Sequence, residues 1–189
     1  AGCGSGRVAY ELVKRSYEVT GFDYSPRAIE YARILVPEAK FYVLDLTLKS
    51  AIITYENDFD VIIFREVLEH IDPVYYDQIL DYFHTLLTDE GILILTVPTK
   101  RAFRDPLKHY MHFDETEIVE LLENHNFKIK KIVGNIRYGF FYKLLFVSKL
   151  ASTFYALLAP PVLKVLSGKI YARFFNCCPP DKCGRLIIK

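Results

Sequence analysis

The stretch Ala1-Gly2-Cys3-Gly4-Ser5-Gly6 decides the fold, because its three glycines stand at alternate positions just before a helical pattern. Glycine turns the backbone tightly and lets a ligand lie against the main chain, since it has no Cβ. Seventeen residues after Gly6, Asp23 ends a stretch that is typical of a strand. A carboxylate in that place can accept hydrogen bonds from both hydroxyls of a ribose. Together these features predict a ligand containing a nucleoside, held across the carboxyl ends of parallel strands.

The rest of the chain alternates between helical and strand patterns of apolar residues. Helices are expected near residues 5–15, 26–35, 74–87 and 116–123. Strands are expected near residues 17–22, 41–44, 61–64, 92–97, 127–133 and 186–188, with a loop or short helix over 46–58. Ser25 and Pro26 are typical of a helix start, as an N-cap and a first helical residue. Such alternation predicts an α/β fold with a doubly wound, mostly parallel sheet and right-handed crossovers.

The glycine spacing distinguishes between two kinds of nucleoside ligand. A dinucleotide fingerprint, G-x-G-x-x-G, would need glycine where Arg7 stands. The observed G-x-G-x-G resembles motif I of the class I S-adenosylmethionine (SAM) methyltransferases, of the ubiquinone and small-molecule type. The resemblance extends from Ala1 to about Val133. Its further landmarks, in order, are Asp45, Phe59-Asp60-Val61, Glu66-Val67-Leu68-Glu69-His70 and Asp89-Glu90-Gly91.

The resemblance implies a Rossmann-like sheet of seven strands and SAM as the cofactor. The first of those strands would come before Ala1 and is absent from this chain, so we expect a longer native protein. Three regions are expected. Residues 1–136 form the SAM-binding core, 137–182 an apolar and basic helical insert or lid, and 183–189 the final strand of the sheet.

The resemblance also implies which residues hold the cofactor. Asp23 would bind the ribose, Tyr24 would lie beside the adenine, and Asp45 would bind the adenine amino group. For Asp45 a turn or cap role at the strand end is the alternative, and Arg65 could instead meet a substrate carboxylate or phosphate. The cofactor-binding residues so implied are Gly2, Cys3, Gly4, Gly6, Asp23, Tyr24, Ser25, Asp45, Leu46, Phe64 and Arg65.

Three histidines are the candidates for catalysis: His70, His109 and His112. A neutral imidazole can accept a proton from a hydroxyl nucleophile. The alternative is that His109 and His112 only pack and cap, and that His70 supports the loop after the preceding strand. Some ubiquinone-type relatives bind a divalent metal through the pattern that Glu66, Glu69 and His70 form here, but we expect no metal. Alignment of the reacting atoms supplies most of the acceleration in methyl transfer.

The distribution of charge along the chain indicates which partners it could contact. The 189 residues carry a net charge of +1, yet no Asp or Glu stands between Asn124 and Pro180, where nine Lys and Arg occur. Residues 140–176 therefore suit contact with an anionic membrane surface, and a lid or a homodimer interface is the alternative.

The four cysteines are too few for a disulfide scaffold, which favours a cytoplasmic location. Cys177, Cys178 and Cys183 are expected in a loop without metal.

These observations predict a SAM-dependent methyltransferase that acts on an oxygen, nitrogen or carbon nucleophile. The acceptor would be a small molecule, lipophilic or glycosylated, and no nucleic acid partner is expected. A non-catalytic SAM-binding module is the alternative from another class. A dinucleotide-dependent oxidoreductase is the third interpretation, which Arg7 disfavours.

Overall fold

The computed structural model describes residues 1–48, 58–101, 108–137 and 183–188. Strands and helices alternate along it, as the sequence predicts for an α/β fold. The first part holds α1 (Arg7–Val13), β1 (Thr20–Asp23), α2 (Pro26–Leu35) and β2 (Lys40–Val43). The second part holds β3 (Phe59–Arg65), the 3-10 turns η2 (Leu68–His70) and η3 (Pro73–Tyr75), α3 (Tyr76–Leu86), β4 (Leu87–Pro98), α4 (Glu115–Asn124), β5 (Ile132–Arg137) and β6 (Cys183–Ile188).

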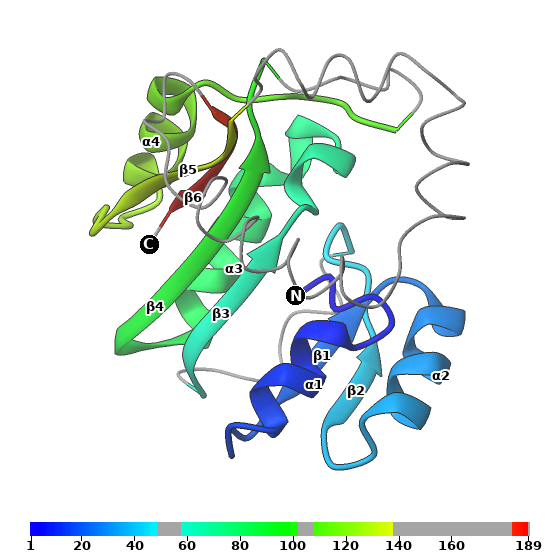
Figure 1. The fold of residues 1–189 in the computed structure, drawn as a ribbon. Coiled ribbons are helices and arrows are strands. Elements are labelled where there is room, and N and C mark those ends of the chain that lie inside the picture. Colours follow the sequence, from blue (N-terminus) through cyan, green and yellow to red (C-terminus); the bar gives the residue numbers. More distant parts are fainter. Residues whose placement is uncertain (49–57, 102–107, 138–182, 189) are drawn as a thin grey trace, which may run out of the picture.

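The described strands form two hydrogen-bonded sets. β1 and β2 pair in parallel, and the second set has the order β3-β4-β6-β5. β3 and β4 are parallel, whereas β6 runs antiparallel to both of its neighbours. In Figure 1, α1 lies in front of β1 and α3 lies behind β3 and β4, so helices cover opposite faces. The glycine turn at the start of the chain contacts both β1 and β3, because the Cys3 N–H donates to the Phe22 carbonyl and the Ala1 nitrogen donates to the Ile63 carbonyl.

The main core lies between α3 and the β3–β4 pair. Phe64 of β3 and Phe83 of α3 are both almost fully buried, and their rings meet edge to face with centroids 4.9 Å apart. A continuous apolar run such as 61–64 is typical of a strand covered on both faces, but Val61 keeps 46% of its surface exposed. Ile62 and Phe64, on the opposite face of the pleat, are buried.

Two strands begin later than the sequence predicts, for the same reason. After α1 the chain continues through Ser16, whose φ is +64°, and the Tyr17 N–H donates back to the carbonyl of Leu12. After α4 it continues through Asn126, also at φ +64°, and Phe127 N–H donates to the carbonyl of Leu122. Left-handed residues of this kind close a helix. The first residues of each expected strand, from 17 and from 127, thus close the preceding helix instead.

Helix starts follow the sequence closely. Ser25 caps α2, since its Oγ accepts a hydrogen bond from the Ala28 N–H. Asp114 and Glu117 form a reciprocal capping box at the start of α4. The third helix differs, because it begins with the separate 3-10 turn η3 before α3 proper.

Most of the expected insert, 138–182, lies outside the described residues, and with it Cys177 and Cys178. Cys183 begins strand β6, which agrees with the final strand expected over 183–189 and not with the loop expected for the three cysteines. Among the helices of the described ranges, none combines the length and apolarity that crossing a membrane requires.

Candidate functional site

The three glycines of the opening turn all have positive φ, at +64° for Gly2, +53° for Gly4 and +83° for Gly6. A Cβ on Gly2 would lie 2.3 Å from Val67 Cγ2, and one on Gly6 would lie 3.1 Å from Ala32 Cβ. At Gly4 nothing stands within 4 Å of the Cβ position. Gly2 and Gly6 are therefore needed for close packing within the protein. Gly4 instead turns an open face of backbone outward, where a ligand can approach the main chain.

Asp23, at the end of β1, is tied to this turn. Its Oδ2 accepts a hydrogen bond from the Gly4 N–H at 2.8 Å, and its Oδ1 accepts one from the Ser25 N–H at 3.0 Å. A carboxylate has about four lone-pair sites, so two bonds leave acceptor capacity for further hydroxyl groups. The carboxylate is thus held in a fixed orientation beside the open backbone of Gly4.

Cys3, between the first two glycines, is kept as a neutral thiol. Burial raises the pKa of Cys3 to about 11, and the nearby negative charge of Asp23 adds to that shift. Its N–H donates to the carbonyl of Phe22, which links the turn to β1. The turn also reaches β3, since the nitrogen of Ala1 donates to the Ile63 carbonyl at 2.8 Å.

Three other residues expected to hold the cofactor come directly after β1 or shortly after β2 in the chain. The Tyr24 side chain is 75% exposed next to Asp23. Asp45 Oδ1 accepts hydrogen bonds from both the N–H and the hydroxyl of Thr47, which is the turn role that the sequence left open. Leu46 is buried, and its carbonyl accepts a hydrogen bond from Gln78 Nε2.

The carboxyl end of β3 contains a strained residue. Phe64 is buried in the core and Arg65 is exposed. Glu66 has φ +54°, a conformation that costs free energy for a residue other than glycine. Two bonds to β4 hold it there, because Glu66 N–H donates to the Thr96 carbonyl and Glu66 Oε1 accepts from the Thr96 hydroxyl. This strain could not be predicted from residue types, since the positive φ of Glu66 depends on those contacts.

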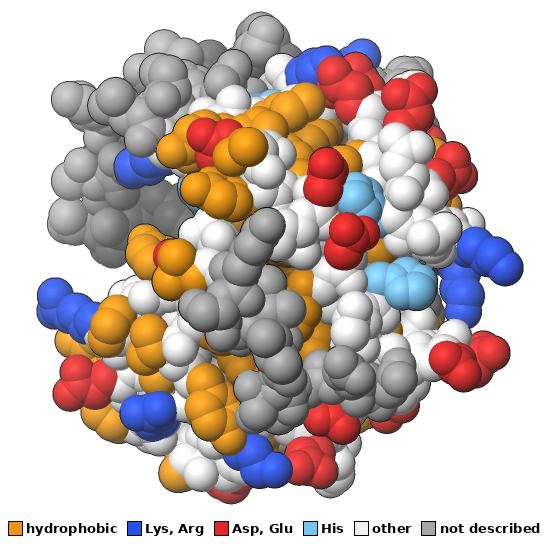
Figure 2. All heavy atoms as spheres, turned by 180° about the vertical axis from the view of Figure 1, so that it is seen from behind, with side chains coloured by type: hydrophobic (Ala, Val, Ile, Leu, Met, Phe, Trp, Pro, Cys, Tyr) orange, Lys and Arg blue, Asp and Glu red, His pale blue; other side chains and the backbone are white. Residues whose placement is uncertain are grey.

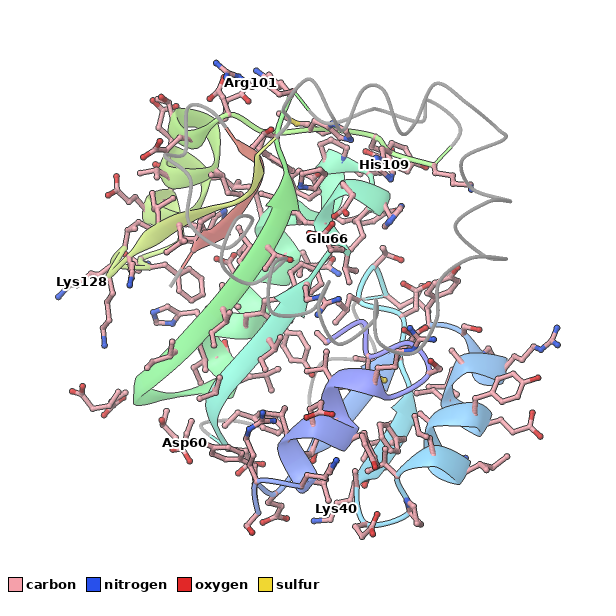
Figure 3. All side chains as sticks on the ribbon, viewed as in Figure 1. Lys40, Asp60, Glu66, Arg101, His109 and Lys128 are labelled. Atoms are coloured by element: carbon pink, nitrogen blue, oxygen red, sulfur yellow. The ribbon has the colours of Figure 1, made fainter. Side chains whose placement is uncertain are left out.

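The three candidate histidines come together, although they are up to 42 positions apart in the sequence. His70 ends η2, and the other two belong to the segment that follows β4. The ring centroids of His70 and His109 are 4.7 Å apart, and those of His109 and His112 are 4.9 Å apart. Figure 3 shows His109 and Glu66 at the same end of the sheet, where β3 and β4 finish.

Backbone groups join η2 to the segment 108–113. The Tyr110 N–H donates to the Glu69 carbonyl at 2.8 Å, and His70 Nδ1 lies 2.7 Å from the Lys108 carbonyl oxygen. These partners were missed by sequence reasoning, because a main-chain carbonyl carries no signal in residue type. In the part of the chain that the structure describes, no three His, Cys, Asp or Glu side chains are grouped as metal ligands would be.

Glu69 is a further polar residue of this region, and only 2% of it is exposed. Its Oε1 lies 3.9 Å from His70 Nε2. Nearby, the Tyr76 hydroxyl donates to the Leu68 carbonyl. Burial raises the pKa of Tyr76, and the charge of Glu69 raises it further. A buried carboxylate thus lies beside the exposed imidazole of His70.

Parallel strands that carry a glycine turn and a fixed carboxylate at their carboxyl ends define a Rossmann-like α/β protein. The chain belongs to a methyltransferase domain family, whose model matches residues 1–132.

Two curated relatives illustrate the likeness. An uncharacterized methyltransferase of Synechocystis is 31% identical over 125 residues, which cover 65% of this chain and 58% of the relative. A ubiquinone biosynthesis O-methyltransferase of Rickettsia bellii is 28% identical over 152 residues, covering 70% and 62%. The chain therefore spans about three fifths of the length of these relatives.

Solved structures share the fold. A SAM-dependent methyltransferase of Methanosarcina mazei has a TM-score of 0.62 at 23% identity, over 72% of this chain and 82% of that one. A SAM-dependent methyltransferase of Archaeoglobus fulgidus has a TM-score of 0.66 at 18% identity, over 99% and 81%. The [4+2]-cyclase SpnF reaches 0.67 at 19% identity, over 99% and 71%. At these identities the likeness shows the fold.

Proposed function

We propose that the protein is a SAM-dependent methyltransferase. The observation that carries the proposal is the pairing of Gly4 with Asp23: an open stretch of backbone lies beside a carboxylate that its own turn holds in place. Membership of the methyltransferase domain family supports it. When bound, SAM supplies a methyl group already activated by a sulfonium centre, so the protein has mainly to align it with the acceptor.

The residues that would hold SAM fit this ligand. In the turn of Gly2, Cys3, Gly4 and Gly6, the open backbone at Gly4 would face the methionine part, and the neutral Cys3 thiol adds no charge there. Asp23 would accept hydrogen bonds from the ribose hydroxyls through its remaining lone pairs. The other residues of the proposed site are Tyr24, Ser25, Asp45, Leu46, Phe64 and Arg65.

We propose that the acceptor is a small molecule with an oxygen, nitrogen or carbon nucleophile, lipophilic or glycosylated in character. The proposed catalytic residues are the three clustered histidines. For the whole protein we propose a cytoplasmic location with contact to anionic membrane through residues 140–176, or a homodimer interface there, and no nucleic acid partner. The charge distribution of 124–180 supports the membrane contact.

Titration calorimetry with SAM, its demethylated product and NAD tests the cofactor. We expect the first two to bind and NAD to fail. Tighter binding of NAD would contradict the proposal in favour of an oxidoreductase. Transfer of a labelled methyl group to cell-extract fractions, with and without lipids, then tests the activity. Binding of SAM without transfer to any fraction would favour a non-catalytic SAM-binding module.

A further inference from the structure

We infer that Nε2 of His70 is the atom that takes the proton from the acceptor, with Glu69 as the residue that stabilises the resulting cation. His109 and His112 are positioning residues in this assignment. The inference rests on the proposed methyl transfer, and it deepens that proposal by separating three histidines into one base and two supports. It also restricts the acceptor to a nucleophile with an O–H or N–H proton to lose.

The tautomer of His70 follows from its partner. The carbonyl oxygen of Lys108 can only accept, so the contact at 2.7 Å requires a proton on His70 Nδ1. In the neutral ring the lone pair then belongs to Nε2. The His70 side chain is 45% exposed, so a molecule bound at this end of the sheet can reach that nitrogen. The main chain thus presets His70 as a proton acceptor.

The same reasoning gives His112 another role. The carbonyl of Thr99, 3.1 Å from His112 Nδ1, requires a proton on that nitrogen. Neutral His112 therefore accepts at Nε2, and the proton there is donated by His109 Nδ1 at 2.7 Å. Both nitrogens of His112 are occupied, and the side chain is buried. His112 orients His109, whose ring in turn packs edge to face on His70.

Glu69 distinguishes His70 from His109 as the base. Its Oε1 is 3.9 Å from His70 Nε2, too far for a hydrogen bond in the neutral state. Once Nε2 takes a proton, opposite charges face each other where water is largely excluded on the Glu69 side. Among the residues that the structure describes, Glu69 on η2 and His109 on the segment 108–113 both lie against His70. Of these two side chains, the carboxylate is the one that can attract the imidazolium formed in the step.

Methyl transfer with His70 as the base forms one bond, breaks one bond and moves one proton. The acceptor oxygen or nitrogen forms a bond to the methyl carbon, and the carbon–sulfur bond breaks with its electron pair left on sulfur. The proton of the acceptor moves to His70 Nε2, which becomes an imidazolium and later releases the proton to water. No oxidant, reductant or metal takes part in this step.

Diethyl pyrocarbonate tests the assignment without an acceptor, because this reagent acylates the lone pair of an unprotonated imidazole. Peptide mapping by mass spectrometry after limited reaction at pH 7 gives the rate at each histidine. We expect His70 to react at least tenfold faster than His112. His125 is the internal control, since Asp81 and Asp77 face its two ring nitrogens and its side chain is only 11% exposed. Faster reaction at His109 or His112 than at His70 would overturn the inference.

Methyl transfer tests Glu69 through the separate effects of its substitution on kcat and KM. In Glu69→Gln the imidazolium that forms during the step loses its facing carboxylate, so we expect kcat to fall while SAM affinity and the KM for the acceptor stay near their parental values. Glu66→Gln is the matched control, because the Oε1 of Glu66 is bonded to Thr96. A parental kcat in Glu69→Gln would remove Glu69 from the mechanism. Thermal melting checks that both variants fold.

Methyl transfer separates this inference from the function on which it rests. His70→Ala is expected to bind SAM like the parent protein while kcat falls about 10²-fold or more. Failure of the parent protein to bind SAM would refute the proposed function, but it would not change the rates at which diethyl pyrocarbonate reacts with each histidine. Retention of the parental kcat in His70→Ala would refute the inference alone.

Discussion

Substitutions at Gly4 and at Gly2 can distinguish the effect on ligand binding from the effect on folding. Gly4→Ala puts a methyl group into open space, so its cost to folding is the left-handed conformation, about 1–2 kcal/mol. That methyl would occupy the face where the ligand approaches. We expect SAM binding in calorimetry to fall at least tenfold while thermal melting changes only modestly.

Gly2→Ala is the comparison for that prediction. Its Cβ would overlap the side chain of Val67, so the turn and the residue after β3 would have to move apart. We expect a larger fall in melting temperature than for Gly4→Ala. If Gly4→Ala bound SAM as the parent does, the open face at Gly4 would not be the ligand side.

Asp23→Ala should affect both the turn and the ligand. The variant removes the acceptor of the Gly4 and Ser25 N–H groups, which we expect to lower the free energy of unfolding by about 1–3 kcal/mol. It also removes the proposed ribose contacts, so SAM affinity should fall by roughly one order of magnitude or more. Urea unfolding and calorimetry measure the two effects.

Asp60→Ala is the control for Asp23→Ala, since Asp60 is an exposed carboxylate at the start of β3 (Figure 3). We expect it to leave both quantities close to their parental values. Equal SAM affinity in Asp23→Ala and Asp60→Ala would refute the ribose assignment. The strand-end place of Asp23 could be predicted from the sequence, but its two backbone partners could not, because they depend on how the turn folds against β1.

At the scale of the elements, the capping box of α4 gives a prediction with a pH dependence. The pKa of Asp114 is lowered from its ordinary value of 3.8, first by the hydrogen bond from the Glu117 N–H and then by Lys100. A lowered pKa in the folded state stabilises the protein above the ordinary value, and this contribution is lost as the pH falls through the folded one. We expect Asp114→Ala to lose about 1 kcal/mol at pH 7 in urea unfolding.

The charge-dependent part of that difference should shrink as the pH is lowered below 3.8. Glu120→Ala, an exposed change within the same helix, is the control for helix composition. A loss from Asp114→Ala that stayed the same at low pH would show that the carboxylate charge has no part in the cap.

Packing between elements gives a sharper test of the core. Phe83 of α3 contacts Phe64 of β3, and both rings are inaccessible to solvent. Phe83→Ala should lower the free energy of unfolding by about 3–5 kcal/mol through the cavity it leaves. Val74→Ala removes an apolar side chain that is 74% exposed, and we expect a change within about 0.5 kcal/mol. Similar losses of unfolding free energy in the two variants would show that the Phe64–Phe83 contact is not part of the main core.

Local signals explain which elements could be predicted. Helix starts depend on neighbouring residues, so Ser25 was recognised as a cap from the sequence. The starts of β1 and β5 could not be recognised, because Ser16 and Asn126 adopt a left-handed conformation that their residue types only permit. The histidine cluster shows the same limit. Each histidine was a candidate by itself, but their contacts depend on the meeting of η2 with the segment after β4.

At the scale of the whole molecule, charge is unevenly distributed. The face seen from behind in Figure 2 carries acidic side chains beside histidines, and His125 of the α4 end meets Asp77 and Asp81 of α3. Residues 124–180, in contrast, have nine Lys and Arg and no acid. We predict sedimentation with anionic vesicles that weakens as salt rises, since the Debye length is about 10 Å at 0.1 M. Replacing 140–176 by a short linker should abolish it.

Neutral vesicles are the control for this prediction, because they match the lipid surface without its charge. Equal sedimentation with neutral and anionic vesicles, or none with either, would favour a lid or a homodimer interface for 140–176.

The position of β6 determines the order in which the chain can fold. β3, α3 and β4 are consecutive and can associate soon after they are made, whereas β6 must insert between β4 and β5 after 45 intervening residues. Pairing strands that are so far apart in the sequence is slow, and until then two strand edges remain open to wrong partners. On the ribosome, the four-stranded set therefore stays incomplete until residue 188 has left the exit tunnel. During that interval β4 and β5 are the edges that a chaperone would have to protect.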